Sequence, residues 1–222
     1  LLNRIWHAHF GKIAFGWSLA TIISLFQILG ADATFQTLLT TLLHEYFPFI
    51  ILVGSLYVVS GGILLDIKGK VSAKANAFLL GFGTVLAGWI GTTGAAMLMI
   101  RPLIKLNHAR QYKTHLTVFL IFLVANIGGS ITPLGDPPLF LGFLQGINFF
   151  WTLEYLAPET FVISAALLSI FYVIDHRLLR KESLENDTPK LTFQIQGWFN
   201  FLNLLGIVSL VLLSGVWDPD VS

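Results

Sequence analysis

The sequence contains no cysteine and few charged residues. The absence of cysteine excludes disulfides and thiolate metal sites. Only 11% of the 222 residues are Asp, Glu, Lys or Arg, whereas soluble domains carry about 25%. The net charge of +1 gives no reason to expect a nucleic-acid partner. Apolar residues make up 55% of the chain, in blocks of about 20, which suffices to cross a bilayer. We therefore predict an all-α, polytopic transmembrane helical bundle.

The motifs of common enzymes are also missing. The sequence has no His-Glu-x-x-His, no serine elbow and no paired carboxylates in its apolar blocks. We therefore predict no catalytic residues and a membrane protein that is not an enzyme.

Six apolar stretches account for most of the chain, and two of them are interrupted by glycine or proline. An amphipathic run, Phe35–Glu45, precedes the second stretch and is expected at the membrane interface. The stretches are Phe10–Leu29, Phe47–Leu65, Asn76–Ile100, Thr114–Thr152, Pro158–Ile174 and Trp198–Val216.

The positions of the basic residues predict the topology. All 13 fall in four clusters: Arg4 and Lys12; Lys68, Lys70 and Lys74; Arg101, Lys105, Arg110 and Lys113; Arg177, Arg180, Lys181 and Lys190. If Asn76–Ile100 crossed the membrane, the second and third clusters would lie on opposite sides, against the positive-inside rule. If it enters and returns, every cluster is cytoplasmic. We therefore predict a re-entrant hairpin, 76–105, five crossings and a cytoplasmic N-terminus.

The run Gly91-Thr92-Thr93-Gly94 fits the tip of this hairpin. Its glycines permit a tight reversal, and Thr92 and Thr93 place two hydroxyl groups there. The arm Asn76–Ile90 is about 22 Å long as a helix, so the tip is expected deep in the membrane.

The stretch 114–152 is expected to be a broken helix. Three glycines and Pro133 stop the helix past the membrane midplane, and Pro133 leaves a preceding carbonyl free. A kink alone would usually need one glycine or proline. We expect the break to hold an ion or substrate, with these residues contributing: Asn126, Gly128, Gly129, Ser130 and Thr132.

Asp136 is the one acidic residue that the sequence places well inside the membrane. It precedes Pro137, which fits an N-cap followed by proline at the first helical position. One interpretation is that Asp136 only caps the half-helix Pro137–Thr152. The other is that its carboxylate couples to an ion or proton, because charges inside a membrane are costly and usually functional.

The run Asn126–Pro138 resembles the first-repeat signature of the ion transporter superfamily, above all NhaD-type sodium/proton antiporters, and also citrate transporters. The likeness extends over about residues 44–155. It implies two inverted repeats, each with a hairpin tip that meets a broken helix. It also implies a first ion or substrate site made by Thr92, Thr93, Asn126, Ser130, Thr132 and Asp136. Relatives often carry an Asp-Asn pair at the tip, which is absent here.

These observations predict a secondary transporter of the bacterial inner membrane. A sodium/proton antiporter fits Asp136; a sodium-coupled citrate or dicarboxylate transporter is the alternative. No cofactor is expected, apart from a possible Na⁺ on Asn126, Ser130 and Thr132. The resemblance implies a homodimer. We expect the first repeat over 1–175, a cytoplasmic loop over 176–197 and the start of a second half at 198–222, followed by roughly 200 further residues with an inverted repeat.

Overall fold

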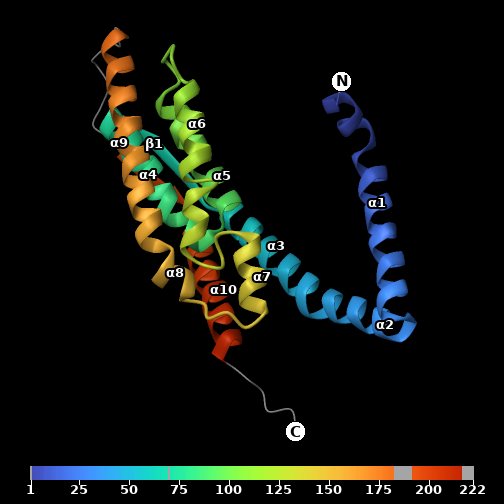
Figure 1. Ribbon diagram of the computed structural model, residues 1–222. Helices are drawn as coiled ribbons and strands as arrows, with labels where there is room; N and C mark the ends of the chain where they lie inside the picture. The colour runs from blue at the N-terminus through green and yellow to red at the C-terminus, as the bar shows by residue number, and fades with distance from the viewer. Residues whose placement is uncertain (1, 70, 183–191, 217–222) are drawn as a thin grey trace. The chain divides into compact units, whose positions relative to one another are not determined.

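Long apolar helices make up most of the chain (Figure 1). The structure is a computed structural model that describes residues 2–69, 71–182 and 192–216. Within these ranges, five helices are long and apolar enough to cross a membrane: His9–Leu29, Ala31–Gly61, Ala73–Ile90, Thr114–Ile131 and Ala157–Lys181. The prediction of an all-α, polytopic helical membrane protein is confirmed. By internal contacts the chain forms two units, Leu1–Pro48 and Phe49–Ser222.

The first unit exposes large apolar side chains, as a lipid-facing segment would. Its elements are α1 (Leu2–Leu29), α2 (Ala31–Thr40) and the π-helix η1 (Thr41–Tyr46). Phe15 is 70% exposed and Trp17 is 73% exposed. The hydroxyl of Thr21 donates to the Trp17 carbonyl at 2.9 Å, which satisfies a polar group that lipid could not. The amphipathic run predicted at the interface lies in α2 and η1, which lead into the next helix without a loop.

The second unit holds most of α3, the helices that follow it and a two-stranded sheet. Its elements are α3 (Phe47–Gly61), β1 (Leu64–Lys68), α4 (Ala73–Ile90), α5 (Thr92–Leu106), α6 (Thr114–Leu123), the 3₁₀ helix η2 (Ile127–Ile131), α7 (Pro137–Leu144), α8 (Trp151–Tyr155), α9 (Ala157–Lys181), β2 (Thr192–Gln196) and α10 (Phe199–Val216).

Helices α4 and α5 form a hairpin that lies at the centre of the main apolar core. The N-cap Ser72 starts α4 by accepting a hydrogen bond from the Ala75 amide at 3.1 Å. Gly91, at φ +81°, ends α4, and α5 begins at the next residue. The arms pack closely because Gly83 faces Met99, where a Cβ would lie 2.6 Å from Cγ.

The broken helix has shorter arms than its sequence suggests. We expected a half-helix over Pro137–Thr152, but α7 ends at Leu144, and the first arm, α6, ends at Leu123, before the glycines of the break. Gly146, at φ +90°, turns the chain after α7. The Asn148 side chain then accepts from the Phe150 amide at 2.8 Å, a local turn that leads into α8.

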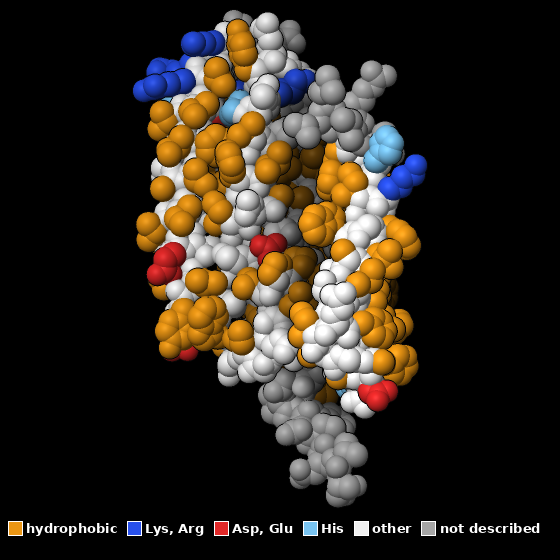
Figure 2. All heavy atoms as spheres, turned by 45° about the vertical axis from the view of Figure 1, so that its right-hand side comes forward, with side chains coloured by type: hydrophobic (Ala, Val, Ile, Leu, Met, Phe, Trp, Pro, Cys, Tyr) orange, Lys and Arg blue, Asp and Glu red, His pale blue; other side chains and the backbone are white. Residues whose placement is uncertain are grey.

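The stretch predicted as a loop, 176–197, is partly regular. Helix α9 extends through Lys181, and β2 pairs antiparallel with β1, so that Leu64 lies opposite Gln196. The strand pairing was not predicted, because neither five-residue strand stands out from the apolar blocks beside it. Figure 2 shows hydrophobic side chains over much of the visible surface, with Lys and Arg gathered toward one end of the second unit.

Candidate functional site

The hairpin tip and the broken helix meet through hydrogen bonds, and two of these are accepted by backbone carbonyls. The backbone amide of Thr92, at the start of α5, donates to the Gly135 carbonyl at 3.1 Å. One turn earlier, the Gly88 carbonyl of α4 accepts from the Thr132 hydroxyl, and Thr132 is 1% exposed. Irregular backbone from both segments is therefore satisfied by protein, which is what a membrane interior requires.

Asp136 points its carboxylate at the tip rather than at its own helix. It occupies the N-cap position of α7 and Pro137 follows, as the sequence predicted, but its side chain makes no capping hydrogen bond. Instead its Oδ1 accepts from the Thr92 hydroxyl at 3.2 Å. The side-chain capping interpretation of Asp136 is therefore wrong, because the carboxylate is turned toward a different element.

Two glycines of the break allow this close approach. A Cβ on Gly129 would lie 2.5 Å from the Asp136 carboxyl carbon. A Cβ on Gly128 would lie 2.8 Å from the Ala87 Cβ of α4. Real Cβ atoms do not come this close, so only glycine lets η2 rest on α4 while the carboxylate of Asp136 folds back over it.

A cavity of about 300 Å³ opens beside this contact. Among the predicted site residues, Thr92, Thr93 and Asp136 line it. Within the described ranges, its lining includes no Lys, Arg or His. The remaining polar groups are the Tyr57 hydroxyl of α3 and backbone atoms of the tip and the break, and apolar side chains from α3 and α7 close the rest. The lining residues are Phe49, Ile50, Leu52, Val53, Gly54, Leu56, Tyr57, Ile90, Gly91, Thr92, Thr93, Gly94, Pro133, Leu134, Gly135, Asp136, Pro137 and Phe140.

The remaining predicted site residues lie beside this cavity rather than on it. Ser130 donates to the Ile127 carbonyl at 2.8 Å and lies 2.7 Å from the Thr160 hydroxyl of α9. Asn126 is exposed at the start of η2, where its backbone carbonyl accepts from the Gly129 amide at 3.0 Å. The three predicted Na⁺ ligands, Asn126, Ser130 and Thr132, thus make separate contacts with different elements.

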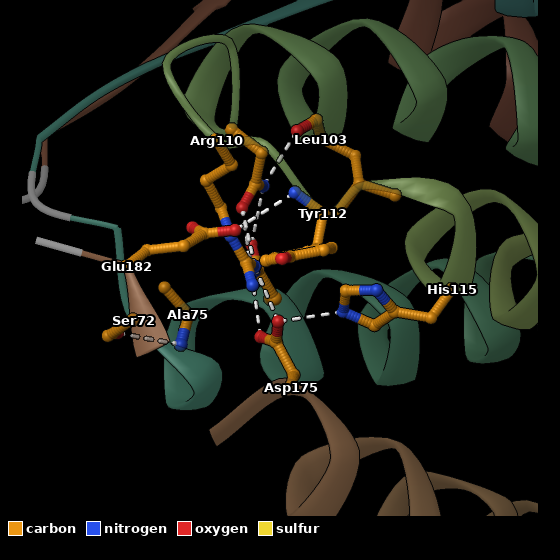
Figure 3. Close-up of polar contacts among 10 residues, drawn as sticks. Ser72, Ala75, Leu103, Arg110, Tyr112, His115, Asp175 and Glu182 are labelled. Carbon is orange, nitrogen blue, oxygen red and sulfur yellow. Dashed lines mark hydrogen bonds and ion pairs between the residues drawn. The ribbon is translucent and has the colours of Figure 1, made fainter. Parts of the chain in front are cut away.

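A second polar cluster was not predicted from the sequence. It lies at the base of the hairpin and centres on Asp175, which is 0% exposed, and Arg110, which is 2% exposed (Figure 3). The pattern of basic residues places Arg110 with the others on the cytoplasmic side and predicts nothing for Asp175. The available signal was Asn76, a side-chain amide at the start of an apolar block, because a buried amide needs partners.

The fold and this arrangement define a multi-pass helical membrane protein in which a helical hairpin meets a broken helix at a polar cavity. The chain belongs to the family described as "Putative citrate transport", whose model matches residues 1–222. The predicted likeness to citrate-transporter-like ion transporters is thereby confirmed. No curated protein and no solved structure matches the chain.

Proposed function

We propose that this chain forms one half-site of a sodium/proton antiporter, with the cavity at Thr92, Thr93 and Asp136 as its cation site. The observation that carries the proposal is the Asp136 carboxylate, which faces the cavity with one hydroxyl hydrogen bond and without a basic partner in the lining. A carboxylate, threonine hydroxyls and backbone carbonyls are hard oxygen ligands, which suit a partly dehydrated alkali cation.

The same carboxylate gives a proton a place to bind. One acidic group that takes either a cation or a proton, but not both, couples the two ions by competition. This requires that bound Na⁺ and bound H⁺ exclude one another at Asp136. Ser130 and Thr132 do not bind the ion in this proposal. Their hydroxyls position the site, because they hold η2 and the residue after it against α9 and α4.

The topology proposal rests on the base of the hairpin. The side chains of Asn76, in α4, and Asn107, just after α5, hydrogen-bond to each other at 2.8 and 3.0 Å. The chain therefore enters and leaves the hairpin at the same end of the unit. This geometry supports a re-entrant hairpin. From the positions of the basic residues we propose that both ends of the hairpin and the N-terminus lie on the cytoplasmic side of a bacterial inner membrane.

Sodium-coupled citrate transport is the second candidate, and the family match is the observation in its favour. Citrate carries several negative charges, and the cavity offers a carboxylate instead of a cationic side chain. A half-site of this kind would have to gain its cationic groups from another part of the full protein or from a second subunit. We also propose that the protein forms a homodimer and that it is not an enzyme.

The test compares two transport assays on the protein reconstituted in liposomes. A trapped pH dye should report proton movement when external Na⁺ is added to liposomes that hold an acidic interior. Uptake of labelled citrate, driven by a Na⁺ gradient, should stay at the level of empty liposomes. The reverse pattern would favour the citrate transporter, and activity in neither assay would reject both candidates.

Matched variants connect the activity to the site. Asp136→Asn should abolish Na⁺-dependent proton movement because it removes the titratable group without changing its size. Glu159→Gln, at the exposed start of α9, makes the same chemical change away from the cavity and should leave the activity unchanged. Wild-type activity in Asp136→Asn would reject the proposed site.

A further inference from the structure

A second cavity, of about 260 Å³, lies between the second arm of the hairpin and the two-stranded sheet. None of the described residues lines both this cavity and the one at Asp136. Helix α5 contributes Arg101 and Lys105, β1 contributes Asp66, and β2 contributes Gln196. Leucine side chains of β1 form its apolar part. The cavity therefore combines basic, amide and apolar groups from three elements.

The charges around this cavity leave one basic group without a counter-ion. Lys105 Nζ pairs with Asp66 Oδ1 at 2.5 Å. Arg101 stands one turn earlier on the same face of α5. It is exposed, and within the described ranges it forms no ion pair. Two positive charges and one negative charge give the lining a sum of +1, which suits a ligand with one negative charge.

The other arginine near the hairpin base cannot take this role. Arg110 is 2% exposed. Its guanidinium donates to Asp175 of α9 at 2.5 Å and to Glu182 at 3.0 Å (Figure 3). Two buried carboxylates thus use its charge, whereas the guanidinium of Arg101 is available to an anion from outside the chain.

The cavity lies at the depth of phospholipid headgroups. Along α5, about 14 Å separates Arg101 from Thr92 at the hairpin tip. With the tip near the midplane, as the sequence predicts, this distance reaches the edge of a hydrocarbon core of about 30 Å. Lys and Arg gather toward one end of the second unit (Figure 2). Ile104, beside Arg101 on α5, is 55% exposed, and Trp198, just after β2, is 72% exposed. Such apolar side chains suit contact with acyl chains.

We propose that this cavity binds the headgroup of one anionic phospholipid. The Arg101 guanidinium donates to the phosphate as a planar fork. Lys105 adds positive charge, and the Gln196 amide can donate to a further headgroup oxygen. Leu64 lies where the glycerol and the first acyl carbons would leave the cavity. A zwitterionic lipid has no net charge and leaves the +1 of the lining uncompensated, so an anionic lipid is preferred.

Native mass spectrometry of the chain in detergent tests the site with phosphatidylglycerol and phosphatidylcholine of the same acyl composition. The wild type should bind one phosphatidylglycerol more tightly than one phosphatidylcholine. Arg101→Gln should weaken phosphatidylglycerol binding about tenfold, because it removes charge-assisted hydrogen bonds. Arg180→Gln, at an exposed arginine in the last turn of α9, removes the same charge elsewhere and should keep the wild-type affinity. Equal affinities in the two arginine variants would overturn the proposal.

Asp66→Asn tests the charge argument in the opposite direction. The change removes the carboxylate from the lining and releases Lys105, so phosphatidylglycerol should bind more tightly than to the wild type. Unchanged or weaker binding would contradict the assignment. Thermal unfolding without lipid checks the fold of each variant, and Arg101→Gln should match the wild type because it loses no described ion pair.

Inorganic phosphate separates a lipid from a soluble anion. A phospholipid is also held by its apolar contacts, so phosphate in excess should not displace it. Displacement by phosphate would assign the cavity to a soluble anion and overturn the lipid assignment. Each of these outcomes leaves the antiporter proposal untouched, because that proposal depends on Asp136 in the other cavity.

Discussion

Gly129→Ala should move the Asp136 carboxylate without removing it. The new methyl group would lie 2.5 Å from Oδ2 and 2.6 Å from Oδ1 of Asp136, whereas ordinary contacts begin at 3.4 Å. The carboxylate therefore has to shift by about 0.9 Å, the difference between 3.4 and 2.5 Å. It is the atom group that can yield, because it ends a flexible side chain while Gly129 belongs to packed backbone.

This shift is expected to break the hydrogen bond between the Asp136 carboxylate and Thr92 at the hairpin tip. The Thr92 hydroxyl donates to Asp136 at 3.2 Å, which is already long for an O–H···O bond. Loss of a hydrogen bond to a charged group costs about 1.5–3 kcal/mol. Since about 1.4 kcal/mol is tenfold in affinity, Na⁺ binding should weaken by roughly 10- to 100-fold. Overpacking should lower the free energy of unfolding by about 1–3 kcal/mol.

Two matched glycine variants separate binding from stability. Gly128→Ala would press against Ala87 at 2.8 Å and against backbone carbonyls of α4 and α6, but not against Asp136. It should lose stability and keep its Na⁺ affinity. Gly206→Ala, inside α10 and with nothing within 4 Å, should keep the Na⁺ affinity and should not lower the stability. Calorimetric Na⁺ titration and thermal unfolding in detergent give both quantities. Equal Na⁺ affinity in the Gly129 and Gly128 variants would refute the reasoning.

Three further predictions concern topology and charge. Single cysteines at Ser72 and His108, in a chain that has no cysteine of its own, should react with an impermeant maleimide from the same membrane side; labelling from opposite sides would refute the re-entrant hairpin. Arg110→Met should destabilise the protein by about 3–5 kcal/mol, measured by thermal unfolding, because it leaves buried carboxylates unpaired. Lys105→Met should cost less than about 1 kcal/mol in the same assay, because its 2.5 Å pair with Asp66 is largely exposed; a loss as large as that of Arg110→Met would contradict the distinction.

The sequence predicted those features that follow from local chemistry. Gly91 was expected to turn a hairpin, and it does so at positive φ. The glycines and proline after Asn126 were expected to break a helix, and only a 3₁₀ turn remains there. Helix ends were less predictable. The end of α6 at Leu123 depends on how η2 packs against α4, which is a contact between segments about 40 residues apart in the sequence.

The direction of the Asp136 side chain could not be predicted from the neighbouring residues in the sequence either. Asp-Pro favours a helix start, and the helix does start there, but the carboxylate turns to Thr92 across 44 positions of sequence. The cluster around Asp175 was missed for the same reason. Its members stand at the ends of different apolar blocks, where a charged residue ordinarily meets water, and only the packing of α4, α6 and α9 buries them.

The long sequence separation within the hairpin base has a consequence for biogenesis. Asn76 hydrogen-bonds to Asp175, which is made 99 residues later. At the usual rate of synthesis this delay is roughly 5–20 s. During that interval the Asn76 amide, at the start of α4, must be satisfied by water, by Asn107 or by the insertion machinery. We therefore expect a ribosome-bound chain that stops before α9 to hold its hairpin near the membrane surface, and full insertion to follow the emergence of Asp175.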